Sequence, residues 1–240
     1  MKPPKFSDWL RESLLTIGRA PMIWIGYTLF MGAVFVFGRI SLALGVFFAV
    51  ICLFVGVGIA KYIDLKICSE RTPTIYWVIN KSLPLAIIVA STIVILWFVF
   101  MATAAVFSGE YYKIALFFFN WELTPENLKF KNMRELADWV FGFANVTLVF
   151  VLLMLTTFSS WFSHSLMLFQ DLNLSQAKEQ GMKAAIKNQN AIYKLMGFII
   201  AQAILCSSIT PLLTPFLYML TSSLLYVSYK SIFEIKSDIN

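Results

Sequence analysis

One stretch of the chain groups hydroxyl and imidazole side chains at helical spacing. Four residues fall at positions i, i+4, i+7 and i+8, on one face of an α-helix: Thr156, Ser160, Ser163 and His164. This face predicts a ligand site or a pore lining for a small molecule or an ion, at the cytoplasmic end of a helix. The alternative is that the hydroxyls hydrogen-bond to neighbouring helices and serve packing alone. The sequence leaves both interpretations open.

Few other residues offer chemistry. The chain has a single histidine, which excludes a multi-histidine metal site, and it lacks the P-loop, G-x-S-x-G and H-E-x-x-H motifs. We therefore expect no catalytic residue, no metal and no cofactor. A lipid-processing enzyme is the weakest alternative, because its catalytic group would have to be Glu110, Glu122, Glu126 or His164, and no arrangement of these is visible.

The composition indicates whether the chain folds in water or in a membrane. Of 240 residues, 59% are apolar and only 13% are charged, against about 45–50% and about 25% in soluble domains. A soluble fold of this size cannot cover so much apolar surface. A soluble enzyme, a nucleic-acid-binding protein and a disordered chain are thereby excluded, and a membrane protein is predicted.

Uncharged stretches locate the membrane spans, each needing about 20 residues. We expect one membrane domain, 1–240, with an outer loop at 108–138. Pro211 and Pro215 divide the last uncharged run into two spans, because proline interrupts a helix. The six predicted spans cover about 20–38, 40–60, 82–107, 139–165, 192–210 and 212–229.

The basic residues predict the orientation. With six spans, fourteen Lys and Arg lie on the side of the termini and five on the other side. Basic residues are enriched in cytoplasmic loops, so both termini are expected in the cytoplasm.

Three cytoplasmic segments combine apolar residues at helical spacing with a charged face. They are 6–18, 75–79 and 175–186, with Ser175 as a possible N-cap of the third. A basic residue at the cytoplasmic interface precedes the following span in each case: Arg19, Lys81 and Lys187. The predicted fold is all-α and polytopic, with six transmembrane helices as three hairpins, each preceded by an interfacial amphipathic helix. Alternatively, the repetition reflects only the need of any hairpin protein for basic residues at its cytoplasmic ends.

Small residues recur at four-residue spacing in two spans. They are Ser41, Gly45 and Ala49 in the second, and Gly197 and Ala201 in the fifth. Such faces allow helices to approach closely, within one chain or between copies. We expect them to serve helix packing, and we expect the protein to form homo-oligomers.

Two regions carry a resemblance to a known group of proteins. One is the start, from Trp9 to Pro21; the other runs from Leu174-Ser175-Gln176-Ala177 through Lys187-Asn188 and Pro215 to Tyr226–Phe233. Both resemble uncharacterised six-span bacterial inner-membrane proteins, distantly similar to the membrane domain fused to some glycerophosphodiester phosphodiesterases. The resemblance implies a bacterial inner-membrane location and brings no activity. The long aromatic outer loop departs from the pattern.

These observations predict a non-enzymatic integral membrane protein that affects envelope integrity or permeability, including tolerance to toxic small molecules. The expected partners are the lipid bilayer and further copies of the chain; nucleic acid is not expected, and the small-molecule ligand is unknown. The alternative is a transporter or channel-like conduit for a small amphipathic or cationic compound. The lack of charged residues within the spans argues against coupled ion transport.

Overall fold

The computed structural model describes residues 4–68, 74–129 and 131–234. These residues form α-helices joined by short helical turns, and the described part contains no strand. In chain order the elements are α1 (Phe6–Arg19), α2 (Pro21–Val34), η1 (Phe35–Arg39), α3 (Leu42–Cys68), α4 (Ile75–Ser108), α5 (Tyr112–Phe118), α6 (Pro125–Lys129), α7 (Met133–Met154), η2 (Leu155–Ser159), α8 (Ser163–Gln170), α9 (Leu174–Lys187), α10 (Gln189–Ser208), η3 (Pro211–Leu213) and α11 (Thr214–Phe233).

Among the described residues, six helical segments are long and apolar enough to cross a membrane, which confirms the all-α polytopic prediction. Their bounds are Pro21–Arg39, Leu42–Ile67, Ile75–Ser108, Met133–Thr157, Gln189–Ser208 and Pro211–Phe233. The break between the last two lies at the predicted prolines. Pro211 and Pro215 each occupy an N-terminal position of a helical segment, where the missing N–H has no intrahelical partner to lose.

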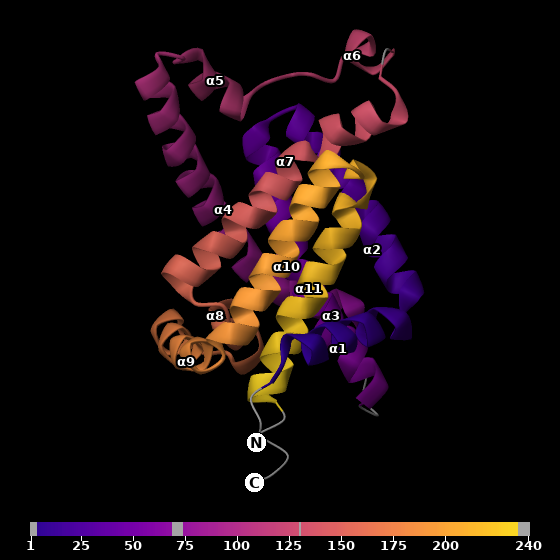
Figure 1. Cartoon of the computed structure of the whole chain (residues 1–240), viewed down its shortest axis with the longest axis vertical. Coiled ribbons are helices and arrows are strands. Elements are labelled where there is room, and N and C mark those ends of the chain that lie inside the picture. Colours follow the sequence, from indigo (N-terminus) through magenta and orange to yellow (C-terminus); the bar gives the residue numbers. More distant parts are fainter. Residues whose placement is uncertain (1–3, 69–73, 130, 235–240) are drawn as a thin grey trace.

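Helices α3 and α11 form the buried centre of the bundle. Within the apolar windows of these two helices 72% of residues are buried, against 17% for α4. Close contact between α3 and α11 depends on Gly56, because a Cβ there would lie 2.5 Å from the Ser222 Oγ and 2.7 Å from the Tyr27 hydroxyl oxygen. Helices α1, α8 and α9 lie at one end of the bundle, and α5 and α6 lie at the other (Figure 1).

Helix α1 runs across the bundle, as the interfacial prediction requires (Figure 1). It buries Trp9, Ser13 and Thr16 and exposes Leu14. The Trp9 Nε1 donates a hydrogen bond of 2.6 Å to the Ser231 Oγ near the end of α11. The start and the end of the described chain therefore lie at the same end of the molecule.

The second predicted interfacial helix is not a separate element. Residues 75–79 form the first turns of α4, which continues through Pro84 to Ser108. Membrane helices tolerate an internal proline when other groups satisfy the freed backbone. Since α1 and α9 are separate helices and 75–79 is not, the repeated unit is complete only in its first and third copies.

Two further boundaries differ from the predictions. The third interfacial helix is capped by Asn173, whose side chain accepts from the Gln176 N–H, and not by Ser175. The predicted outer loop 108–138 ends early, because α7 begins at Met133 behind a capping box formed by Asn132 and Glu135.

Candidate functional site

The predicted fourth span does not continue to 165. Helix α7 passes into the π-helical turn η2, and Ser160 then has a φ of +95°, so the chain turns before α8 begins at Ser163. Positive φ is uncommon for residues other than glycine, and π-turns inside helices frequently occur at functional sites. The premise that four polar residues share one helical face is therefore wrong, since the break separates Thr156 from Ser163 and His164.

Thr156 and Ser160 lie on one side of this break. They line a cavity of about 160 Å³ between η2, α9 and α10, which we name the hydroxyl recess; its other lining residues include Thr157, Met182 and Ile192. The Ser160 hydroxyl is buried against Gly181 of α9 and has no hydrogen-bond partner among the described residues. Ser163 is 1% exposed and lines neither this cavity nor the one described next.

His164 lies on the other side of the break. Its ring is 5% exposed and packs on the Phe54 ring, with 4.0 Å between the ring centroids. Within the part of the chain that the structure describes, neither ring nitrogen has a hydrogen-bond partner. Burial lowers the pKa of His164 from its ordinary value to about 3, so the imidazole is neutral at neutral pH. It then offers one N–H donor and one nitrogen acceptor, and leaving both unpaired is unfavourable.

The cavity beside His164 has a volume of about 240 Å³ and lies between α4, α7 and α8; we name it the α4 groove. Apart from His164 and Thr92, its lining is aliphatic or thioether. Along α4 it extends from Leu85 to Leu96, about 16 Å at the helical rise per residue. Because Ile88 and Leu96 are 63% and 36% exposed, the groove faces the surface that the bilayer covers.

A charged cluster at the same end of the bundle was missed by the sequence analysis. Asp64 in α3 is 7% exposed and lies 2.6 Å from the Lys230 Nζ, and it accepts a 2.6 Å hydrogen bond from the Tyr226 hydroxyl. A second ion pair of 2.7 Å joins Lys61 to Glu234. The predicted span ended at residue 60, whereas α3 continues to Cys68 and carries Asp64 into contact with α11. The sequence spacing could have predicted this cluster, because Lys61 and Asp64 lie on one helical face and Tyr226 and Lys230, at i and i+4, lie on another.

The acidic residues considered for lipid chemistry lie far from His164. Glu122 accepts from Arg39 and from the Trp139 Nε1, each at 2.9 Å. Burial works to raise the pKa of Glu122, but these partners hold it below its ordinary value. Glu110 pairs with Lys113 at 2.5 Å. Both belong to the end of the bundle that carries α5 and α6, opposite α8 (Figure 1), so the structure does not bring them together with His164.

The small residues predicted to serve packing divide into two groups. Ser41 and Ala49 are buried, and a Cβ on Gly45 would lie 2.6 Å from the Gly38 Cα and 2.9 Å from the Phe143 ring. Gly197 and Ala201, by contrast, are exposed on α10, and a Cβ on Gly197 would meet nothing within 4 Å. The first group packs within the chain, whereas the second lies on its outer surface.

The three basic residues predicted at the cytoplasmic interface lie at the end of the bundle that carries α1, α8 and α9. Arg19 lies 3.9 Å from Glu12, and Lys81 lies 3.2 Å from Asp171 just after α8. Lys187 is the last residue of α9 and lines a large cleft at the junction with α10. All three residues lie at one end of the bundle, as expected for residues on the same side of a membrane. That this side is the cytoplasmic one stays a prediction.

Within the described ranges, no three His, Cys, Asp or Glu residues are placed to hold a metal ion together. Comparison of the chain with family models, with curated proteins and with solved structures finds no match to any of them. The resemblance to six-span inner-membrane proteins therefore stays a prediction.

Proposed function

We propose that this protein is a non-enzymatic, multi-pass protein of the bacterial cytoplasmic membrane that binds neutral, hydroxyl-bearing amphipathic molecules in the α4 groove. By holding such molecules it affects the permeability of the envelope and the tolerance of the cell to them. The observation that carries the proposal is the buried imidazole of His164, which has no hydrogen-bond partner among the described residues, in a largely apolar groove that faces lipid.

The chemistry of the groove selects the class of ligand. An aliphatic lining takes an alkyl chain, which is already dissolved in the bilayer and reaches the groove from the side. A hydroxyl group can donate to the unprotonated ring nitrogen or accept from the ring N–H, so a ligand hydroxyl can pair with either polar atom of neutral His164. A cationic group could pair only with the unprotonated nitrogen, and its charge would lose hydration in the aliphatic lining, which favours a neutral amphipathic compound over a cationic one.

The cellular location and the oligomeric state form part of the same proposal. The excess of basic residues at the end that carries α1 and α9 supports cytoplasmic termini. The exposed pair Gly197 and Ala201 on α10 supports self-association, because small residues let membrane helices of two copies approach closely.

Photolabelling of the protein in lipid nanodiscs tests the proposal. The ligand used is a diazirine analogue of 1-dodecanol, and labelled peptides are identified by mass spectrometry. We expect label on α4 and α8 in the native chain and its loss in Leu96→Trp, which fills the groove. Val106→Trp is the matched control, because Val106 is 51% exposed on the same helix outside the groove. Equal labelling of the two variants would refute the proposal.

The cellular arm uses a strain that lacks the gene. We expect its tolerance to long-chain alcohols to change, and we expect the Val106→Trp variant to restore it while Leu96→Trp does not. Equal restoration at equal membrane abundance would show that the groove has no part in the phenotype.

A further inference from the structure

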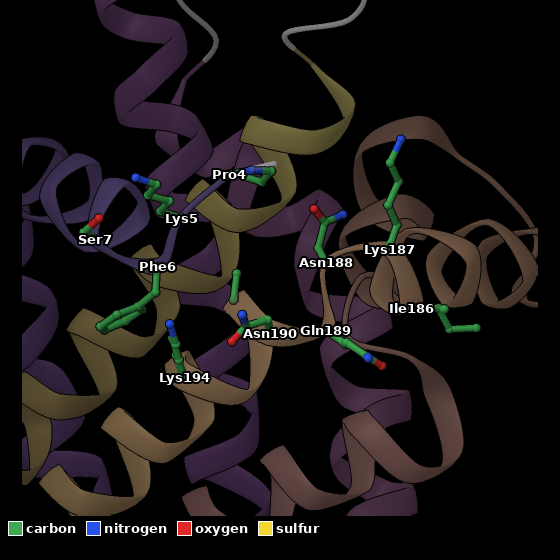
Figure 2. Close-up of a pocket in the computed structure, with 11 residues that line it drawn as sticks. Pro4, Lys5, Phe6, Ser7, Ile186, Lys187, Asn188, Gln189, Asn190 and Lys194 are labelled. Carbon is green, nitrogen blue, oxygen red and sulfur yellow. The ribbon is translucent and has the colours of Figure 1, made fainter. Parts of the chain in front are cut away.

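A further cavity lies apart from the α4 groove, at the end of the bundle that carries α1 and α9. It has a volume of about 730 Å³ and separates the start of α1 from the junction of α9 and α10. We name it the elbow cleft. Three lysines line it, Lys5, Lys187 and Lys194, together with the amides of Gln189 and Asn190. In Figure 2 Lys5 and Lys194 lie on one side of the cleft and Lys187 on the other.

The positive charges of the three lysines that line the cleft have no acidic partner among the described residues. Throughout the ranges that the structure describes, no carboxylate lies within 4.0 Å of these three ammonium groups, whereas other lysines at this end, such as Lys81 and Lys230, form ion pairs. Helix α10 begins at Gln189 without a side-chain hydrogen bond to its first N–H groups, so the positive end of its dipole adds to the field in the cleft. An anion is the ligand that satisfies these groups.

The cleft continues into surroundings that suit an apolar body. Ile186 and Gln189 line both the elbow cleft and the hydroxyl recess, so the two cavities adjoin. The recess offers hydroxyl groups from Thr156 and Thr157 above apolar side chains of α9 and α10. Met182 and Ile186 of α9 are 46% and 65% exposed, which places this helix at the bilayer surface.

We propose that the elbow cleft binds the phosphate of an anionic glycerophospholipid, with its glycerol and upper acyl carbons in the hydroxyl recess. Basic pockets at helix ends on the cytoplasmic side suit such headgroups, since each lysine near the surface attracts anionic lipid. The inference is independent of the α4 groove, which lies on the other side of the break at Ser160 and holds no lysine.

Native mass spectrometry of the full chain in a non-ionic detergent tests this site. The ligands used are phosphatidylglycerol, phosphatidylcholine and glycerol 1-phosphate. The variant Lys5→Gln/Lys187→Gln/Lys194→Gln removes the three charges of the cleft. Its matched control is Lys66→Gln/Lys178→Gln/Lys183→Gln, which removes three exposed charges at the same end but none that lines the cleft.

We expect the native chain to bind phosphatidylglycerol more tightly than phosphatidylcholine. We expect the cleft variant to bind phosphatidylglycerol at least about tenfold more weakly than the control variant does. Glycerol 1-phosphate is expected to bind more weakly than the lipid, because it leaves the recess empty. Equal loss in the two variants would overturn the site. Tight binding of glycerol 1-phosphate, or no preference for phosphatidylglycerol, would overturn the assignment to a lipid. Thermal melting of both variants by circular dichroism establishes that they are folded.

Discussion

Removing the carboxylate of Asp64 is expected to destabilise the bundle strongly. In Asp64→Ala, Lys230 loses an ion pair of 2.6 Å and Tyr226 loses its acceptor. Breaking a fully buried pair by removing one partner costs about 3–5 kcal/mol. The side chains of Asp64 and Lys230 are 9% and 25% exposed, so Lys230 regains some hydration and we expect about 2–3 kcal/mol. The assay is reversible unfolding in mixed micelles, followed by circular dichroism.

The control and the double-mutant cycle make this prediction refutable. Glu179→Ala breaks an ion pair on α9 whose side chains are 67% and 75% exposed, and we expect no measurable change in the free energy of unfolding. Asp64→Ala combined with Lys230→Met is expected to cost less than the sum of the two single changes, because no unpaired charge is left. Additive effects, or an Asp64→Ala variant as stable as Glu179→Ala, would show that the Asp64–Lys230 ion pair does not stabilise the contact between α3 and α11.

Three further predictions test other parts of the structure. Gly56→Ala forces α3 away from α11 and is expected to cost about 1–3 kcal/mol in the same assay, whereas Gly26→Ala, with open space around it, leaves stability unchanged or slightly higher. Gly197→Leu is expected to shift the protein toward monomers in single-molecule photobleaching, and Gly26→Leu is not. The same distribution of oligomeric states in the two variants would show that α10 is not the contact between copies. The pKa of Glu122 in the folded chain lies below its ordinary value of 4.5, so the Glu122 carboxylate stabilises the fold above pH 4.5. This contribution is lost as the pH falls through the pKa of the folded chain. We therefore expect Glu122→Gln to reduce the loss of unfolding free energy at acid pH.

The spans were predictable because the bilayer excludes charge, and the uncharged runs therefore mark the helices that cross it. Pro211 and Pro215 added a local backbone signal that divided the last run. The prediction of a separate second interfacial helix was wrong. Proline tends to end an isolated helix, but in this bundle α4 continues through Pro84.

The site was less predictable, because its geometry depends on contacts distant in sequence. The run 139–170 contains no charge and no proline, so nothing local marks the turn at Ser160, which lies against Gly181 of α9. The isolation of His164 likewise depends on Phe54 of α3. Residue spacing brought Thr156, Ser160 and His164 to attention, but only the fold shows that they face two cavities.

We propose that His164 is neutral, has no partner among the described residues and can pair with a ligand hydroxyl in the α4 groove. Because the chain has a single histidine, ¹⁵N NMR of histidine-labelled protein in nanodiscs reports on it alone. We expect a neutral imidazole that does not titrate between pH 5 and 8, and a change in the ring ¹⁵N shifts when 1-dodecanol is added, absent in Leu96→Trp. A protonated imidazole at pH 7, or ring shifts unchanged by the alcohol, would contradict this proposal.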